Sequence, residues 1–457
     1  MKRLVVASAL GMAMAILATI GLLVAGAGRG ASDSAAETPS PEIAREAARL
    51  RAMGPVGLTA AFKRQADLNM SGDRAAALRD WKALVDAVAG QRDAWASRLY
   101  WYTDLEVAKS AAAKAGKPIL SLRLLGRLTD EHSCANSRYF RKTLYPSAAV
   151  GDFLRENFVL HWESVRPVPT VTIDFGDGRK LKRTITGNSV HYVLDCHGRL
   201  VDALPGLYGP EQFLSLLGPA QEAAARCGAL ASPHYCRQVT EYHQRQRSDA
   251  DARLKQDLEL LGPKAGRLSG AAELLARVPP ELVIEFPTGQ SPATPADIVP
   301  RVAVRRDVIY SADPLPDPNW RIWSALATRH FEHLQADDEA MRVVAPGLRR
   351  AERANRVALP KFDVEAPLVA NIALMEFSRN RAIDGVYNEF ALHYRIHEYL
   401  SNTEPLKLPL ADFTRWCYAE VFLSPLDDPW YGLKSDAYDG YDPPPEKQTA
   451  QVAREAN

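Results

Sequence analysis

The sequence has almost no net charge and few cysteines. Its 457 residues include 56 basic and 55 acidic side chains, a formal net charge of +1, and five cysteines. A nucleic-acid-binding domain concentrates lysine and arginine into a basic face, and a small secreted domain held by disulfides needs a much denser set of cysteines. We therefore expect neither a nucleic-acid partner nor a disulfide framework.

Common nucleotide-binding and catalytic motifs are also missing. The chain contains no G-x-x-x-x-G-K-[ST], G-x-G-x-x-G, G-x-S-x-G or H-E-x-x-H pattern. These patterns supply the phosphate-binding loop, the dinucleotide turn, the nucleophile elbow and the zinc-protease helix, respectively. The sequence therefore gives no support for nucleotide binding or hydrolase chemistry, and we expect no cofactor.

The N-terminus combines a short basic segment with a long uncharged one. Lys2 and Arg3 precede residues 4–28, which carry no charged side chain. Such a segment directs export, and it is long enough to cross a bilayer as a helix. The Ala-Gly-Ala at residues 25–27 also matches a signal-peptide cleavage site. Residues 1–28 are thus either a cleaved signal peptide or, as their length favours, a transmembrane anchor, and both place the remaining chain in the periplasm or cell envelope.

Composition and periodicity change several times along the chain, which predicts a multi-domain protein. We expect an α/β domain, then a proline-rich linker, then an all-α C-terminal domain, because nine prolines in one stretch are incompatible with regular helix. The predicted segments are the N-terminal segment at 1–28, a flexible tether at 29–42, a helical lead-in at 43–98, the α/β domain at 99–226, a helical connector at 227–278, the proline-rich linker at 279–318, the α-helical domain at 319–433 and a disordered tail at 434–457.

The helical lead-in shows an apolar stripe at helical spacing. The stripe consists of Leu78, Trp81, Leu84, Val85 and Val88. Steps of three and four residues place these side chains on one helix face. We expect that face to pack, so the role of this region is structural.

The α/β domain alternates between helix and strand patterns. Thr103 and Glu106 have capping-box spacing at the start of its first helix, and Gly116 ends that helix. The predicted elements are a helix at 103–116, a strand at 117–126, a helix from 147 that leads into a strand ending at 165, a hairpin at 169–187 turned at an Asp-Gly pair, a hairpin at 189–206 turned at Cys-His-Gly, and a helix at 209–227.

This order of elements, with the helix rich in Ala and Lys before the Gly-Lys-Pro at residues 116–118, resembles the exported form of the thioredoxin-like fold. The resemblance covers roughly residues 99–220. In that family a C-x-x-C pair begins the helix after the first central strand, and Cys134 stands at the place of the first cysteine. Ser137 replaces the second cysteine, and Asn188 and Ser189 stand where the family has a cis-proline. The resemblance therefore implies a degenerate C-x-x-S motif, with Asn188 and Ser189 flanking the substrate groove.

Two interpretations of Cys134 remain open. If Ser133 caps the helix, Cys134 lies in its first turn, where backbone N–H groups stabilise a thiolate. A hydroxyl at Ser137 cannot resolve a mixed disulfide, so we do not expect dithiol turnover, and the redox roles that remain are exchange with an external thiol and thiol sensing. The alternative, which the frequent burial of free cysteine favours, is a buried or capping residue in a non-catalytic module.

Two further cysteines bracket a predicted turn between helices. Cys227 and Cys236 are separated by eight residues that include Pro233. A disulfide there would close a helical hairpin, and two unpaired thiols fit the same pattern. The spacing alone leaves both open.

Three histidines fall on apolar helix faces in the C-terminal region. His393 and His397 are four residues apart, which is suitable spacing for two metal ligands, and His330 lies on the apolar face of another predicted helix. Histidines hydrogen-bonded within a core give the same pattern. Because no third or fourth ligand can be identified, we expect core histidines and keep these three only as weak metal candidates.

Taken together, these patterns predict an exported cell-envelope protein whose thioredoxin-like domain is a non-catalytic interaction module. The alternative is a monothiol exchange or thiol-sensing protein that uses Cys134, with Ser137 donating a hydrogen bond to the thiolate. In that case the enzyme would be of the thiol-disulfide oxidoreductase type. The expected partner is another protein, or a thiol-bearing protein, with membrane attachment through the N-terminal segment.

Overall fold

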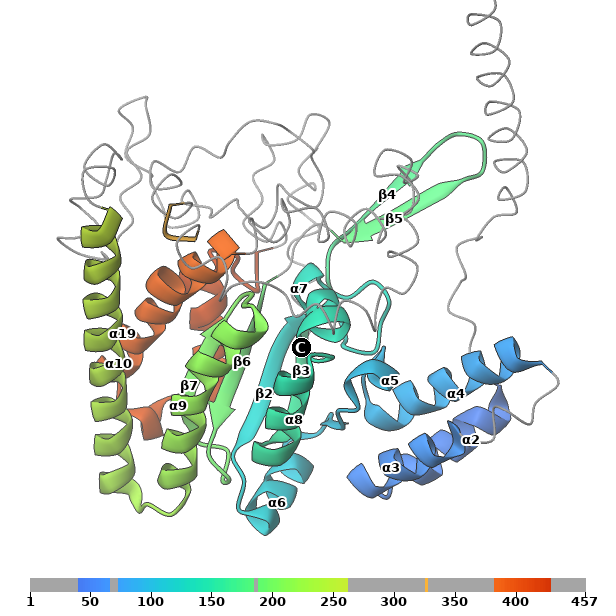
Figure 1. Cartoon of the computed structure of the whole chain (residues 1–457), viewed down its shortest axis with the longest axis horizontal. Coiled ribbons are helices and arrows are strands. Elements are labelled where there is room, and N and C mark those ends of the chain that lie inside the picture. The colour runs from blue at the N-terminus through green and yellow to red at the C-terminus, as the bar shows by residue number, and fades with distance from the viewer. Residues whose placement is uncertain (1–39, 66–72, 185–187, 262–324, 328–381, 429–457) are drawn as a thin grey trace, which may run out of the picture. The chain divides into compact units, whose positions relative to one another are not determined.

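The computed structural model describes residues 40–65, 73–184, 188–261, 325–327 and 382–428 (Figure 1). From Glu42 onward these residues belong to one compact unit. No helix within the described part of the chain is long and apolar enough to span a membrane. The predictions for the N-terminal segment, the proline-rich linker, the tail and His330 lie outside the described residues.

The lead-in is helical, as predicted. It consists of α2 (Pro41–Arg51), α3 (Pro55–Lys63), α4 (Arg74–Ala89) and α5 (Ala94–Ser97). Trp81 of α4 is buried and its Nε1 donates a hydrogen bond to the carbonyl of Ala61, 3.1 Å away. The predicted stripe is buried except for Leu78, which is 37% exposed. Helix α2 also begins inside the segment that we expected to be a tether.

A five-stranded mixed sheet lies at the centre of the fold. The strands are β1 (Trp101–Tyr102), β2 (Ile119–Leu125), β3 (Val159–Arg166), β6 (Ser189–Leu194) and β7 (Leu200–Pro205), in the order β1-β3-β2-β6-β7. β3 runs parallel to β1 and β2, whereas β6 is antiparallel to β2 and to β7. β4 (Thr170–Asp174) and β5 (Lys180–Thr184) form the other predicted hairpin, as a separate two-stranded sheet. The predicted α/β class is therefore confirmed, and the structure adds that its sheet is mixed.

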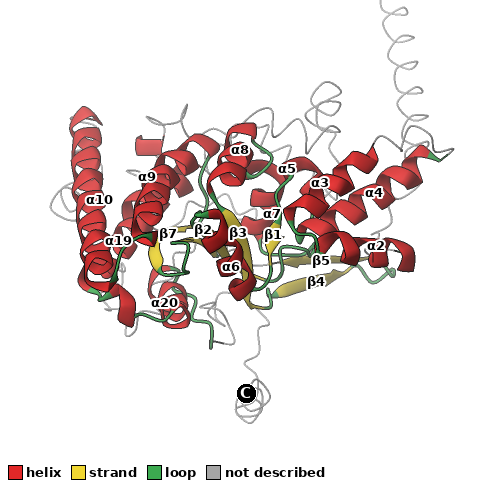
Figure 2. Ribbon diagram, turned by 90° about the horizontal axis from the view of Figure 1, so that it is seen from below, coloured by secondary structure: helices red, strands yellow, loops and turns green. Residues whose placement is uncertain are grey.

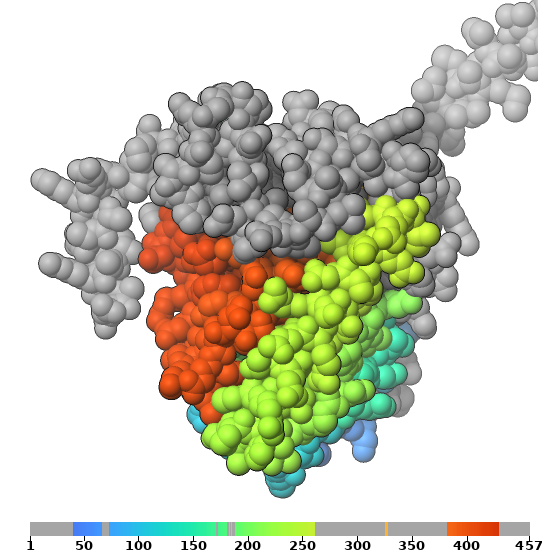
Figure 3. Space-filling model, turned by 90° about the vertical axis from the view of Figure 1, so that its left-hand side faces the viewer, coloured from blue at the N-terminus to red at the C-terminus, as the bar shows by residue number. Residues whose placement is uncertain are grey.

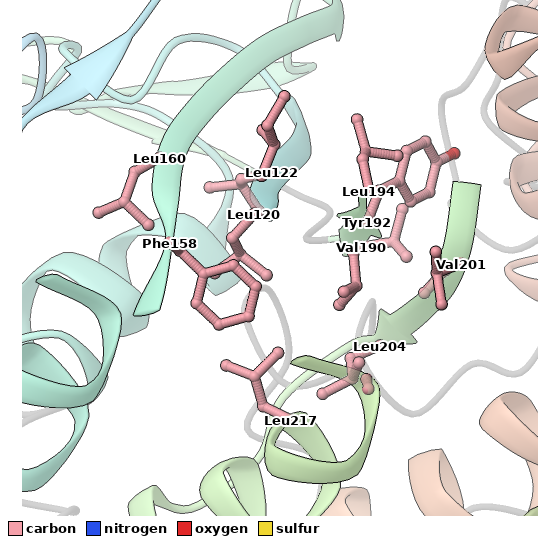
Figure 4. Close-up of a cluster of buried hydrophobic side chains, with 14 of the residues drawn as sticks. Leu120, Leu122, Phe158, Leu160, Val190, Tyr192, Leu194, Val201, Leu204 and Leu217 are labelled. Carbon is pink, nitrogen blue, oxygen red and sulfur yellow. The ribbon is translucent and has the colours of Figure 1, made fainter. Parts of the chain in front are cut away.

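Helices cover both faces of the sheet. α8 (Ala148–Asn157) and α9 (Pro210–Gly228) lie on one side, and α6 (Leu105–Ala115) and α20 (Leu410–Trp416) lie on the other (Figure 2). Side chains from β2, β3, β6, β7 and α9 belong to one buried hydrophobic cluster, in which Leu217 of α9 lies near Phe158 and Leu204 (Figure 4). The predicted end of α6 at Gly116 is confirmed by its left-handed φ of 65°. Its start differs, because Asp104 rather than Thr103 accepts the amides of the first turn.

The C-terminal part is helical, as predicted, but its described residues share the core of the sheet. The helices are η4 (Asn388–His393), α19 (Tyr394–Asn402), η5 (Pro405–Lys407), α20 and η6 (Cys417–Val421). Ile396, Phe413 and Tyr418 belong to the same buried cluster as the strands. The long helix α10 (Ser232–Leu261), which follows α9, packs beside α19 (Figure 3). The C-terminal helices thus complete the α/β core.

Candidate functional site

Cys134 caps the short helix after the central strand. It is the N-cap of α7 (Ala135–Tyr139), which continues into η2 (Phe140–Leu144). Its Sγ accepts a hydrogen bond from the backbone N–H of Ser137 at 3.4 Å, and the Ser137 hydroxyl donates to the Cys134 carbonyl at 2.8 Å. We expected Ser133 to be the N-cap and Cys134 to be the first residue of the helix, so the helix begins one residue later than predicted. The two motif residues therefore stabilise each other and the start of the helix.

The thiol of Cys134 is shielded from solvent. Its side chain is fully buried within the main hydrophobic core. Burial raises the pKa of the thiol, and the hydrogen bonds from Ser137 and the charge of Arg138 oppose this effect without cancelling it. The thiolate is the reactive form of cysteine, and burial disfavours this form at Cys134.

The residues expected to flank a substrate groove contact the C-terminal segment instead. The Asn188 side-chain amide donates to the Ser424 hydroxyl at 2.8 Å, and Tyr418 donates to the Asn188 carbonyl at 3.1 Å. Ser189 is fully buried. Arg166, at the end of β3, donates to the carbonyls of Leu426 and Asp428. This segment therefore covers the place at which the resemblance puts a substrate.

The disulfide that the spacing allowed between Cys227 and Cys236 is not formed. All five cysteines are free thiols. Cys227 points from α9 into the main core and is fully buried, and Cys236 is half-buried on α10. Burial raises the pKa of the Cys227 thiol to about 11. The hairpin of α9 and α10 is thus held by apolar packing, as in the second alternative.

A second polar centre lies where β7 meets the helices. Asp202 of β7 is surrounded by Tyr242 and His243 of α10, by His393 at the end of η4 and by His397 of α19. All five side chains are buried. We call Asp202, His243, His393 and His397 the Asp–His cluster. Three stretches of chain that are far apart in sequence converge on it, namely β7, α10 and the consecutive helices η4 and α19.

The distances within the Asp–His cluster are short. Oδ1 of Asp202 is 3.0 Å from Nε2 of His393 and 3.8 Å from Nδ1 of His397. Nδ1 of His397 is 2.8 Å from Nδ1 of His243. On the other side of the carboxylate, the Tyr242 hydroxyl donates to Oδ2 at 2.6 Å. The rings of His393 and His397 are tilted by 34° relative to each other, with centroids 4.0 Å apart.

Burial favours the neutral forms of His243 and His397 in this cluster. Burial would raise the pKa of Asp202, but the neighbouring histidines outweigh it and hold the pKa below its ordinary value. Burial lowers the pKa of His243 to about 4 and lowers that of His397, with His393 adding to the effect on His397. At neutral pH both rings therefore offer a lone pair.

The weak metal candidates were partly correct about which residues meet. His393 and His397 do lie together, and with Asp202 they form a group whose ligand atoms lie within 4.8 Å of one another. Asp202 and His243 were missed. A lone carboxylate in the strand Leu200–Pro205, otherwise apolar, was the one available signal for Asp202.

The two centres differ in what they offer chemically. Cys134 presents a buried neutral thiol, whereas the Asp–His cluster presents one carboxylate next to the imidazoles of His393 and His397, with the imidazole of His243 against that of His397. No protein-family model, curated protein or solved structure matches this chain.

Proposed function

We propose that residues 99–226 form a degenerate thioredoxin-like module that serves as a non-catalytic interaction module. The observation that carries this proposal is the complete burial of the Cys134 thiol at the N-cap of α7. A nucleophilic cysteine needs contact with solvent and a stabilised thiolate. Cys134 has neither, because its side chain is enclosed and its pKa is raised.

The arrangement of the elements supports the family assignment. β2 is the middle strand of the five-stranded sheet, and the helix that begins at Cys134 is the next element after it. The antiparallel pair β6 and β7 and the closing helix α9 follow in the expected order. These are the features on which the resemblance to the thioredoxin-like fold rests.

The surroundings of the motif support the loss of catalysis. The hydroxyl of Ser137 is used in a hydrogen bond to the Cys134 carbonyl. Asn188 is engaged by Tyr418 and Ser424, so a substrate peptide would have to displace the chain's own C-terminal segment. In both cases the residues of the motif are occupied by hydrogen bonds within the chain itself.

The proposed setting is the cell envelope, with the N-terminal segment as signal or anchor. A partner would meet the exposed surface of the module, which includes the β4–β5 hairpin. Ile173 on this hairpin is 45% exposed and the neighbouring Phe175 is 44% exposed. Apolar side chains of this size on a hairpin suit contact with another protein.

The rate of alkylation of Cys134 tests this proposal. The full-length protein is treated with iodoacetamide from pH 6 to 10, and each cysteine is followed by peptide mass spectrometry. We expect Cys134 to react at least about 100-fold more slowly in the native protein than in urea, because alkylation of a buried thiol requires opening of the core. The half-buried Cys236 serves as an internal reference.

The result decides between the two interpretations. Rapid native modification of Cys134 with an apparent pKa below about 8.5 would replace the interaction module with the monothiol protein. A Cys134→Ser variant, treated in the same way, identifies the signal of this residue. Slow modification at every pH below unfolding supports the non-catalytic module.

A further inference from the structure

The Asp–His cluster has the composition of a metal centre. Three imidazoles and one carboxylate are typical ligands for zinc, and four such groups complete a tetrahedral shell. All four come from buried positions on β7, α10, η4 and α19. We propose that Asp202, His243, His393 and His397 bind one divalent transition-metal ion, with zinc as the best fit. This inference does not depend on the proposed function of the thioredoxin-like module.

The spacing of the ligand atoms fits a small cation. With bonds of about 2.0–2.1 Å, neighbouring ligand atoms of tetrahedral zinc lie about 3.3 Å apart. The separations of 3.0 Å from Asp202 Oδ1 to His393 Nε2, 3.8 Å to His397 Nδ1, and 2.8 Å between the two Nδ1 atoms bracket that value. Among the described residues, only Asp202, His393 and His397 have ligand atoms that all lie within 4.8 Å of one another, so the His243 side chain must move toward the ion to complete the shell.

The charge of Asp202 also requires compensation. A fully buried carboxylate is stable only when it is paired or coordinates a metal. In the structure the partners of Asp202 are hydrogen-bond donors, namely Tyr242, the Ala203 amide and His393. A divalent ion at Oδ1 would balance Asp202 and leave a net charge of +1 on the site.

Tyr242 orients the carboxylate for this role. Its hydroxyl holds Oδ2 at 2.6 Å, so that Oδ1 faces the histidines. Hydrogen bonds to the atoms behind the ligands are typical of metal centres and fix the direction of the lone pairs. Tyr242 is thus a positioning residue.

Proton positions are consistent with metal binding. The Nδ1 atoms of His243 and His397 face each other, so without a metal one of them carries the proton between them. On metal binding both Nδ1 atoms present lone pairs: the ring that carried its proton on Nδ1 moves it to Nε2, and the other ring already has its proton there. His393 binds through Nε2 and keeps its proton on Nδ1. The three imidazoles stay neutral, as ligands must.

The site is closed. Asp202 is fully buried and each of the three histidines is at most 4% exposed. Catalytic zinc keeps an open position for water or substrate, whereas structural zinc has four protein ligands. The ion would therefore join β7 to α10 and to the C-terminal helices.

Metal loading of the full-length chain tests this inference. The chelator-treated protein is dialysed against Zn²⁺ or Co²⁺, and bound metal is counted by plasma mass spectrometry. We expect one ion per chain, the strong visible absorption of tetrahedral Co²⁺, and a higher melting temperature with Zn²⁺, because an ion that binds only the folded state stabilises it.

Variants locate the site. His397→Ala should weaken zinc binding by more than about 100-fold, since loss of a ligand exceeds the typical effect of an outer residue. His234→Ala, at an exposed position on the same helix as His243, is the matched control and should bind normally. Tyr242→Phe keeps all four ligands and should weaken binding by about 10–100-fold.

The Tyr242→Phe variant keeps the test decisive if a ligand variant fails to fold. Folded full-length protein that takes up no Zn²⁺, shows no Co²⁺ absorption and melts at the same temperature with either ion would overturn the proposal. The cluster would then be a hydrogen-bonded network. Normal zinc binding by a folded His397→Ala variant would also overturn it.

Discussion

The start of α7 and the Asp–His cluster both bury polar groups, but they satisfy them differently. Cys134 and Ser137 bond to each other's backbone within a single turn of chain. Asp202 depends on Tyr242 and His393, which lie 40 and 191 residues away. A local cap stabilises one helix end, whereas a long-range cluster ties several elements together. Loss of the second should therefore cost far more.

Removal of the central carboxylate is expected to have the largest effect. Asp202→Ala leaves His393, the Tyr242 hydroxyl and the Ala203 amide without their acceptor. Breaking a buried charged network of this kind costs about 3–5 kcal/mol. Urea unfolding followed by circular dichroism measures the change.

Asp177→Ala is the matched control for that measurement. Asp177 is an exposed aspartate on the β4–β5 hairpin that pairs with Arg179. Its removal should change the free energy of unfolding by less than about 0.5–1 kcal/mol. Equal losses in the two variants would refute the contrast between the cluster and a surface ion pair.

Acid should lower the free energy of unfolding through the Asp–His cluster and not through the Cys134 cap. The pKa of His243 is about 4 in the folded state and about 6.5 in the unfolded chain. Between these values the unfolded state binds more protons, so the free energy of unfolding falls as pH drops from about 6.5 to 4. At about 1.4 kcal/mol per pKa unit, this one residue accounts for roughly 3 kcal/mol.

The cap responds at the opposite end of the pH range. Because the pKa of Cys134 is raised, its contribution is complete below about 8.5 and is lost as the pH rises above that value. Urea titrations at pH 4, 5, 7 and 9 separate the two. An acid slope that persists unchanged in a folded His243→Gln variant would assign that slope to other groups, such as His161 and His191, whose burial lowers the pKa to about 3.

Substitution of Cys134 should have the smallest effect. Cys134→Ser keeps a side chain that can accept the Ser137 amide, whereas Cys134→Ala removes the acceptor. A lost N-cap costs about 0.5–2 kcal/mol. We expect Cys134→Ala to be the less stable of the two by about 1 kcal/mol in urea unfolding. A loss as large as that of Asp202→Ala would remove the distinction between local and long-range polar groups.

The same distinction explains which features could be predicted from the sequence. Helix α6, strand β2 and both hairpins follow from short patterns, because glycine, Asp-Gly pairs and apolar runs act on their neighbours. The position of Cys134 at a helix start was also predicted, with an error of one residue. Its burial was left open, since burial depends on tertiary packing that the local sequence does not specify.

The Asp–His cluster was only partly predictable. The spacing of His393 and His397 placed them on one helix face, but nothing near Asp202 or His243 in sequence indicates that they meet these histidines. Their meeting follows from the packing of α10 beside α19 and of η4 and α19 against the edge strand β7. The sequence also did not predict that the C-terminal helices share the core of the sheet, because amphipathic periodicity does not identify the surface that a helix covers.

The shared core has a consequence for biosynthesis. The sheet and α9 are complete at residue 228, but Ile396, Phe413 and Tyr418 are needed to close their core. Roughly 200 more residues must be translated first, which takes about 10–40 s at 5–20 residues per second. During that interval the nascent chain exposes apolar surface that only its last helices can cover, so it depends on chaperones or on a delay in folding.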